Sequence, residues 1–225
     1  MLKVIATHEY VSNFIKYTGD KRGMVLGKCL DETVSKMNYY NYKYQINRDI
    51  SLKALKSYTV FLKSEFEKHD IVIDKSEMRT YYAMGWKFIN AFKKSVLYEN
   101  MLLRDRTRIV TINDDVGIYA QPDFVDYADN VIYEMKSFSL KPLPEYVRKQ
   151  VRIFQLAYPN FNTVIIGFPR NEEYIKPQIV KLTDPKERTK KILLKKLYRY
   201  AMEYGKNIDY EEAIGNRKCI NYRID

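Results

Sequence analysis

Residues 117–138 read GIYAQPDFVDYADNVIYEMKSF, and this stretch decides both the fold and the chemistry expected of the chain. Residues 131–136 are short in extent and rich in apolar and aromatic side chains, which predicts a β-strand. The turn-forming residues 128–130 precede them, so residues 118–127 are predicted to form the partner strand of a hairpin.

Alternation along the second strand sorts its side chains. Glu134 and Lys136 share one face about 7 Å apart, because strand residues rise roughly 3.3 Å each. Asp123 is expected across the hairpin from Glu134, where cross-strand side chains start about 5 Å apart. Asp126 falls on the face opposite Asp123 and is left out of the site.

Two carboxylates and a lysine in this arrangement suit metal-assisted hydrolysis of a phosphodiester. Mg²⁺ is usually held by one or two carboxylates plus substrate phosphate, so Asp123 and Glu134 are the predicted ligands of Mg²⁺ or Mn²⁺. Lys136 is predicted to orient the water and to add positive charge. The alternative for Glu134 and Lys136 is an exposed ion pair on a strand.

Pro122-Asp123 followed by Glu134-Met135-Lys136 resembles the PD-(D/E)xK nuclease superfamily, in particular its RecB-like branch. The resemblance implies an α/β fold with a restriction-endonuclease-like core: a mixed central sheet flanked by helices in the order α-βββ-α-β, here with an N-terminal helical region. It also implies a catalytic glutamate at the end of the helix before the first core strand, where Glu99 stands.

The RecB-like branch places a glutamine-bearing helix after the lysine strand. Residues 144–158 have apolar side chains at helical spacing, which predicts that helix independently. Gln150 borders the apolar face, but the branch's tyrosine four residues later is replaced by Phe154. Gln155, with Tyr158 three residues on, is the other candidate for the site glutamine. An ordinary amide at the border of a helix remains the alternative for Gln150.

A second acidic-x-lysine string, Asp184-Pro185-Lys186, is better explained as the capped start of a basic helix that reaches about residue 204. Other predicted strands cover residues 108–112, 163–168 and 174–182, and other predicted helices cover residues 8–18, 51–69 and 74–99. Two regions are expected: residues 1–73, helical and packed on the core, and residues 74–225, the nuclease core with the basic helix.

The chain has a formal net charge of +11 and a pI near 9.3, which favours polyanionic partners, although a solvated lysine-rich surface is the plain alternative. Arg148, Lys149 and Arg152 are the predicted nucleic-acid contacts, with DNA as the expected partner. The 21 tyrosines are candidates for base stacking or for core packing.

No apolar run is long enough to span a membrane, and the N-terminus lacks a signal-peptide pattern, so a soluble cytoplasmic protein without membrane partners is expected. Cys29 and Cys219 make neither a disulfide framework nor a zinc site, and His8 and His69 have no partners at ligand spacing. The bias towards tyrosine, lysine and isoleucine also resembles proteins of crenarchaeal viruses, which would place the chain in a host cytoplasm.

These features predict a metal-dependent deoxyribonuclease. Within that class, a RecB-like nuclease acting on ends or single strands competes with a Holliday junction resolvase, which would need a symmetric homodimer. From another class, a basic nucleic-acid-binding protein with a nuclease-like fold and no activity predicts DNA binding without cleavage.

Overall fold

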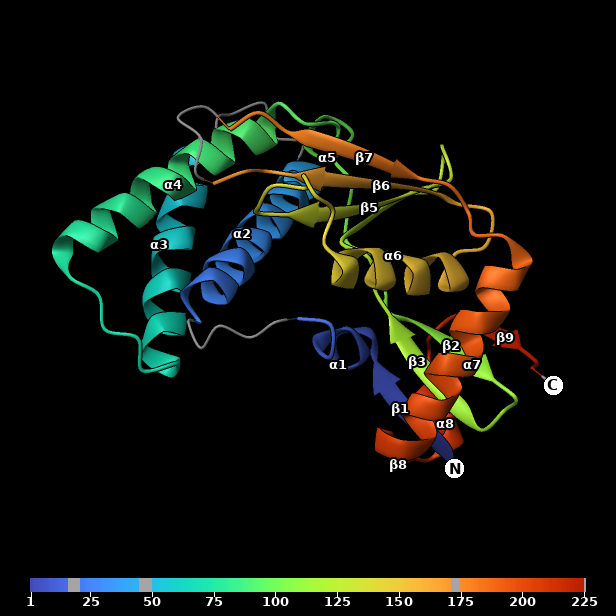
Figure 1. The fold of residues 1–225 in the computed structure, drawn as a ribbon. Coiled ribbons are helices and arrows are strands. Elements are labelled where there is room, and N and C mark those ends of the chain that lie inside the picture. The colour runs from blue at the N-terminus through green and yellow to red at the C-terminus, as the bar shows by residue number, and fades with distance from the viewer. Residues whose placement is uncertain (16–20, 45–49, 171–174, 225) are drawn as a thin grey trace.

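The computed structural model describes residues 1–15, 21–44, 50–170 and 175–224. It is a mixed α/β fold with two mixed sheets flanked by helices (Figure 1). The strands are β1 (Leu2–Ala6), β2 (Arg108–Ile112), β3 (Val116–Ala120), β4 (Phe124–Asp126), β5 (Val131–Lys136), β6 (Asn162–Gly167), β7 (Gln178–Leu182), β8 (Lys206–Ile208) and β9 (Cys219–Tyr222). The helices are α1 (Thr7–Ser12), α2 (Arg22–Tyr44), α3 (Ser51–Lys68), α4 (Lys75–Lys93), α5 (Val96–Glu99), α6 (Glu145–Ala157), α7 (Glu187–Tyr204) and α8 (Tyr210–Ile214).

The strands form two sheets in place of the single central sheet expected from the sequence. One sheet has the order β8-β1-β3-β2-β9, and the other has the order β4-β5-β6-β7. The hairpin β2–β3 is antiparallel, while β1 runs parallel to β3 and β9 runs parallel to β2. The first sheet therefore joins the two ends of the chain to its middle.

The predicted strand over residues 118–127 is wrong as a continuous element. It is split into β3, in the five-stranded sheet, and β4, in the four-stranded sheet. Pro122 lies at the break, and proline cannot donate a ladder hydrogen bond, so a strand is readily interrupted there. The break places Asp123 in the short link between the sheets, directly before β4.

The second half of the hairpin is confirmed. In the β4–β5 pair, Phe124 lies opposite Tyr133, and β5 covers the predicted residues 131–136. The strand β6 then pairs parallel to β5, with α6 as the crossover between them. An antiparallel β7 completes the sheet; it is shorter than predicted, and Tyr174 lies outside the described residues.

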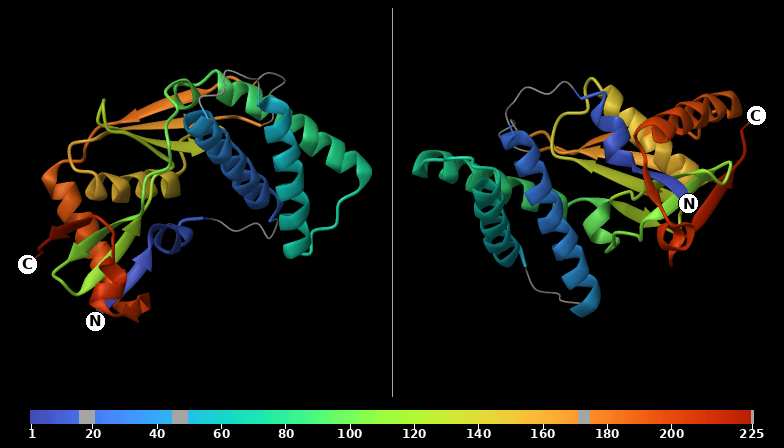
Figure 2. Two further views of the ribbon diagram at one scale, coloured as in Figure 1. Left: turned by 180° about the vertical axis from the view of Figure 1, so that it is seen from behind. Right: turned by 90° about the horizontal axis from the view of Figure 1, so that it is seen from below.

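Helix α6 packs between the two sheets, as Figures 1 and 2 show. Ile153 and Phe154 pack with residues of the five-stranded sheet such as Val110 and Ile118. Val147 and Val151, nearer the start of the helix, pack against Ile165 of β6. The apolar face predicted from the periodicity of residues 144–158 therefore has a partner on each side.

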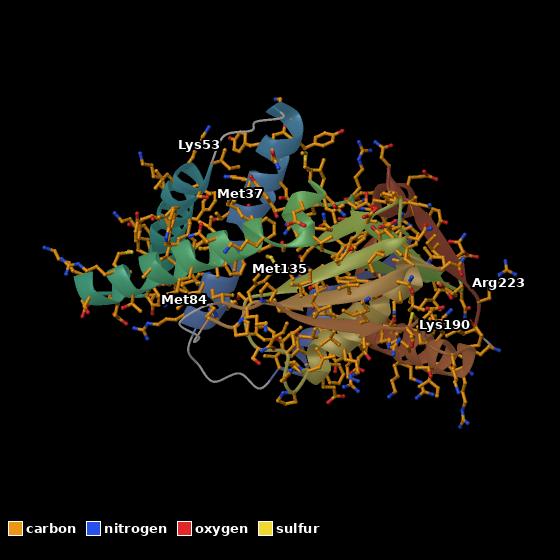
Figure 3. All side chains as sticks on the ribbon, turned by 90° about the horizontal axis from the view of Figure 1, so that it is seen from above. Met37, Lys53, Met84, Met135, Lys190 and Arg223 are labelled. Carbon is orange, nitrogen blue, oxygen red and sulfur yellow. The ribbon has the colours of Figure 1, made fainter. Side chains whose placement is uncertain are left out.

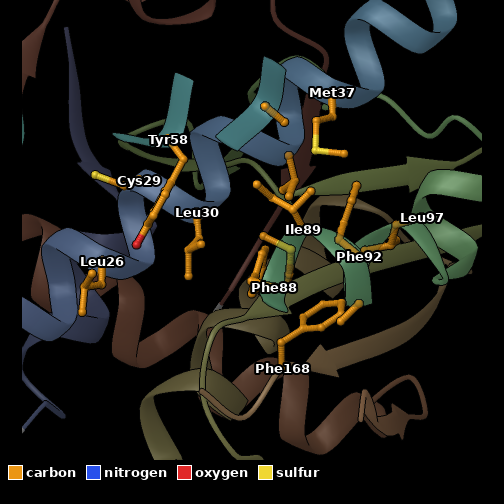
Figure 4. Packing of buried hydrophobic residues seen from close by; sticks show 14 of the residues in the cluster. Leu26, Cys29, Leu30, Met37, Tyr58, Phe88, Ile89, Phe92, Leu97 and Phe168 are labelled. Carbon is orange, nitrogen blue, oxygen red and sulfur yellow. The ribbon is translucent and has the colours of Figure 1, made fainter. Parts of the chain in front are cut away.

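The opposite face of the four-stranded sheet is covered by α2, α3 and α4. Tyr133 and Met135 of β5 belong to the same apolar cluster as Phe88 and Phe92 of α4. Figure 4 shows part of this cluster, with Phe88, Phe92 and Phe168 close together; the rings of Phe88 and Phe168 are 4.9 Å apart. Alternation along β5 thus sends Tyr133 and Met135 towards this helical layer and Glu134 and Lys136 towards α6.

The region of residues 1–73 was expected to be helical, but it also supplies β1 to the five-stranded sheet. Helix α2 was not anticipated, and α4 ends at Lys93 before the separate short helix α5. The capping box at the start of α4 is confirmed, because Asp74 accepts from the Glu77 amide while Glu77 accepts from the Asp74 amide. The division at residue 73 remains a prediction.

The predicted cap at Asp184 is wrong. Helix α7 begins at Glu187 without a side-chain cap, and Asp184 instead forms an ion pair with Lys190, at 2.7 Å. In Figure 3, Lys190 and Arg223 lie on the side of the molecule away from Met84 of α4. In the described part of the chain, no helix is long and apolar enough to cross a membrane.

Candidate active site

Lys136 joins the strand and helix components of the candidate site. Its Nζ donates to Glu134 Oε1 at 2.5 Å and to Gln150 Oε1 at 3.0 Å. Glu134 is almost fully buried, with 2 % of the residue exposed. The ion pair is therefore not an exposed one, since Glu134 is buried and Lys136 is partly buried at the interface between β5 and α6.

Asp123 lies beside the same strand. It precedes Phe124, which pairs with Tyr133, so it stands opposite Glu134 as the alternation argument predicted. One carboxylate oxygen, Oδ2, accepts a hydrogen bond from the Met135 amide at 2.7 Å. That bond fixes the carboxylate and leaves Oδ1 for another partner.

A third carboxylate, Asp31 of α2, was missed from the sequence. Its Oδ2 forms a short contact with Arg104 Nη2, and the same Nη2 lies 3.8 Å from Asp123 Oδ1. Arg104 belongs to the link between α5 and β2. It therefore connects a carboxylate on the helical layer with the carboxylate beside β5.

Small residues on α2 let the helix carry Asp31 to the sheet. Gly23, Gly27 and Asp31 recur every four residues and so lie on one face. A side-chain carbon at Gly27 would lie only 3.3 Å from Ser137 Oγ, just after β5. A helix prediction for residues 22–44 together with this Gly-x₃-Gly-x₃-Asp spacing was the signal that could have identified Asp31.

The electrostatics of the site reflect three carboxylates and two cations close together. Burial, with Glu134 and Asp31 as neighbours, holds the pKa of Asp123 well above its usual value, against the opposing effects of Lys136 and the Met135 amide. Burial alone would lower the pKa of Lys136, but Glu134 and Asp123 outweigh it, and the pKa is raised. Lys136 is therefore a charged ammonium here.

The donor set fits a hard divalent cation. Glu134 Oε2 and Asp31 Oδ1 are buried and have no hydrogen-bond partner among the described residues. Such orphaned anionic oxygens are costly unless a cation approaches them. In the described part of the chain, no three His, Cys, Asp or Glu side chains are already close enough to hold a metal ion. Mg²⁺, however, is commonly held by one or two carboxylates with water and substrate phosphate.

The remaining candidates are separated from this group. Glu99 is exposed at the end of α5, and within the described residues no hydrogen bond or ion pair connects it to Glu134, Lys136 or Asp123. The structure thus brings Asp31, and not Glu99, close to Asp123, and a catalytic role for Glu99 remains a prediction. Asp126 holds the hairpin turn through the amides of Ala128 and Asp129.

Gln155 lies on a different side of α6 from Gln150. It accepts from Arg152 Nη1 and donates to the Thr183 carbonyl, at 2.8 Å and 3.2 Å. Of the two glutamines, the structure brings Gln150 to the lysine and gives Gln155 a structural contact between α6 and the end of β7.

The predicted nucleic-acid contacts differ in their availability. Arg148 is exposed, whereas Lys149 pairs with Glu145 at 3.1 Å and lies over the Phe14 ring. Arg152 also donates to the Thr183 carbonyl, at 2.6 Å. Arg148 is thus the member of this group whose guanidinium projects to solvent, while Lys149 and Arg152 are tied to neighbouring elements.

Comparisons with known proteins do not show a family for this chain. No family model matches the chain, and none of the curated proteins matches it. A solved structure titled "Crystal structure of SSO0001" matches at 12% identity, covering 90% of this chain and 76% of that chain, with a TM-score of 0.38. A similarity this weak supports no inference about fold family or function, so the proposal below depends on the site itself.

Proposed function

We propose that this protein is a metal-dependent nuclease that hydrolyses phosphodiester bonds in DNA, with Mg²⁺ or Mn²⁺ at Asp123 and Glu134. The observation that carries the proposal is Lys136, which is partly buried and bonded to Glu134 and Gln150, beside a carboxylate oxygen of Glu134 that has no partner in the described residues. A resemblance to the PD-(D/E)xK superfamily, and to its restriction-endonuclease-like core, is part of the same proposal.

The charges of the candidate site support the proposed metal-dependent function. When all three are ionised, the carboxylates outnumber Arg104 and Lys136 by one negative charge, so a cation that displaces the proton from Asp123 is attracted to the site. When bound, a divalent ion supplies positive charge for the phosphate and lowers the pKa of a water. The site then has a net positive charge of one, which suits the anionic backbone of the substrate.

Each residue has a defined task in this scheme. The Met135 amide holds one oxygen of Asp123 and leaves the other for the cation, while Arg104 links Asp31 to Asp123. Gln150 and Glu134 fix the ammonium of Lys136. That ammonium orients the attacking water and stabilises the charge that builds on the phosphoryl oxygens.

The experiment is a cleavage panel with Mg²⁺ and Mn²⁺ over linear duplex, single-stranded, flapped and four-way-junction DNA, with an RNA strand as comparison. Asp123→Ala, Glu134→Ala and Lys136→Ala should each abolish cleavage while DNA binding persists. Asp126→Asn is the matched control and should keep wild-type activity, because Asp126 holds the hairpin turn.

The panel also separates the alternatives. Cleavage of ends or single strands supports a RecB-like nuclease, whereas paired cuts in the four-way junction by a dimer support a junction resolvase. DNA binding without cleavage of any substrate would instead favour an inactive nucleic-acid-binding protein. That second candidate rests on the net charge of +11, which favours nucleic acid whatever the chemistry.

A further inference from the structure

Arg170 lies at the same end of the four-stranded sheet as the candidate site. Gly167, three residues before it, pairs with Lys136, and the Phe168 amide donates to the Lys136 carbonyl at 2.7 Å. The Arg170 guanidinium donates to the Gly23 carbonyl in the first turn of α2, at 3.4 Å. Arg170 thus connects the end of β6 with the start of the helix that carries Asp31.

The face of α2 that looks towards this side of the sheet runs from Arg170 to the carboxylates. Gly23 approaches Arg170, Gly27 approaches Ser137, and Asp31 contacts Arg104. Eight residues of helix span about 12 Å, at 1.5 Å each. Arg170, which contacts Gly23, and Asp31 therefore lie about two helical turns apart along one face of α2, where Gly27 packs against Ser137.

Among the described residues, no carboxylate pairs with Arg170. Its neighbours are the phenols of Tyr58, Tyr146 and Tyr81. Burial lowers the pKa of Arg170, in spite of those phenols. The buried Tyr58 hydroxyl has no hydrogen-bond partner among the described residues. Burying a guanidinium costs free energy, and this cost is offset when an anion binds to the group.

Tyr146 connects this cation with the catalytic group. It stands in the first turn of α6, and Lys136, Glu134 and Arg170 all lie close enough to shift its pKa, which is raised chiefly by burial. Lys136 and Arg170 therefore both lie in the surroundings of Tyr146.

We propose that Arg170 binds a backbone phosphate of the substrate strand, neighbouring the phosphate that is cleaved. The inference rests on the proposed function, since it takes the site of Lys136 as the place of cleavage. Arg170 suits this role because guanidinium presents planar paired donors that match phosphate oxygens.

The test measures binding of a short fluorescent single-stranded DNA by anisotropy, with Ca²⁺ in place of Mn²⁺. Arg170→Ala is compared with Arg79→Ala, which removes the same charge from an exposed position on α4. Arg170→Ala should bind about tenfold more weakly, as expected for loss of one charged hydrogen-bonded contact. Its dependence of log affinity on log salt should also be shallower by about 0.7. Arg79→Ala should match wild type.

A scan with single uncharged methylphosphonates along the strand then locates the contact. At one position, neutralising the phosphate and removing Arg170 should together cost no more than either alone, because both remove the same interaction. Equal affinities for Arg170→Ala and wild type, no DNA binding by wild type, or additive losses at every position would each overturn the proposal. A thermal midpoint for Arg170→Ala close to that of wild type excludes misfolding, and if Arg170→Ala does not fold, Arg170→Gln removes the same charge with less loss of volume.

The experiments distinguish failure of the nuclease assignment from failure of the Arg170 phosphate site. If wild type binds DNA with the predicted non-additive position but cleaves nothing, the phosphate site stands and the nuclease assignment falls. If cleavage is seen and Arg170→Ala changes neither binding nor KM, the nuclease stands and the phosphate site falls.

Discussion

Asp123→Asn is predicted to make the metal-free protein more stable while removing its response to metal. The amide oxygen of asparagine can still accept from the Met135 N–H, so the backbone contact of Asp123 Oδ2 is kept. The negative charge is lost from a group that has Glu134 and Asp31 as like-charged neighbours.

The expected gain follows from the raised pKa of Asp123. Because burial and the two neighbouring carboxylates disfavour its charged form, a neutral side chain of the same shape should stabilise the metal-free fold by about 1 kcal/mol. For a chain of 225 residues this corresponds to a rise of roughly 2–4 °C in melting midpoint.

Bound metal should reverse the order of the melting midpoints of wild type and Asp123→Asn. Wild type in Mn²⁺ at a hundredfold excess over Kd gains about 2.7 kcal/mol, or roughly 5–10 °C. Asp123→Asn should gain much less, because its amide is a weaker ligand for a hard cation. Thermal melts in EDTA and in a Mn²⁺ series measure both effects with the same samples.

Asp126→Asn is the matched control. Asp126 is also a buried acid beside β5, but it serves the turn at Ala128 and Asp129. Its substitution should leave the Mn²⁺ shift intact. The reasoning is refuted if Asp123→Asn melts below wild type in EDTA and shows the full wild-type shift in Mn²⁺.

Two further predictions concern the scaffold. Gly85→Ala should destabilise the protein by about 1–3 kcal/mol in denaturant melts, because the new carbon would lie 2.3 Å from the Tyr58 ring. This cost should exceed the gain in helix propensity of about 1 kcal/mol. A neutral or stabilising result would show that α3 and α4 can separate freely. Asp105 accepts from the hydroxyls of Tyr127 and Tyr158, and although burial opposes it, these bonds lower its pKa. A carboxylate with a lowered pKa stabilises the folded state above the unfolded-state pKa near 4, and this contribution is lost as the pH falls through the folded-state pKa. Asp105→Asn should therefore cost roughly 1–2 kcal/mol of stability at pH 7 and progressively less in acid. A cost independent of pH would contradict that assignment.

The sequence predicted the local chemistry better than the architecture. Strict alternation in residues 131–136 placed Glu134 and Lys136 together, and apolar periodicity placed Gln150 on the helix that faces them. These inferences succeed because side-chain direction follows from local backbone geometry.

Long-range relations were harder to obtain. The pairing of β1 with β3 joins residues more than a hundred positions apart, and no local pattern in residues 2–6 specifies it. The break at Pro122 looked like part of one strand because apolar residues flank it on both sides. Asp31 was missed for a related reason: its position beside Asp123 depends on how closely α2 approaches Ser137, and the glycine spacing is the local sign of that approach.

The most direct test of the account is cleavage of DNA by the purified wild-type protein in Mn²⁺, measured beside Glu134→Ala on the same end-labelled substrates. The account predicts cleavage by wild type that EDTA stops, and a rate for Glu134→Ala lower by a factor on the order of a thousand, as expected when electrostatic stabilisation of the transition state is lost. Equal rates for the two proteins, or no cleavage by wild type of any substrate in the panel, would contradict it.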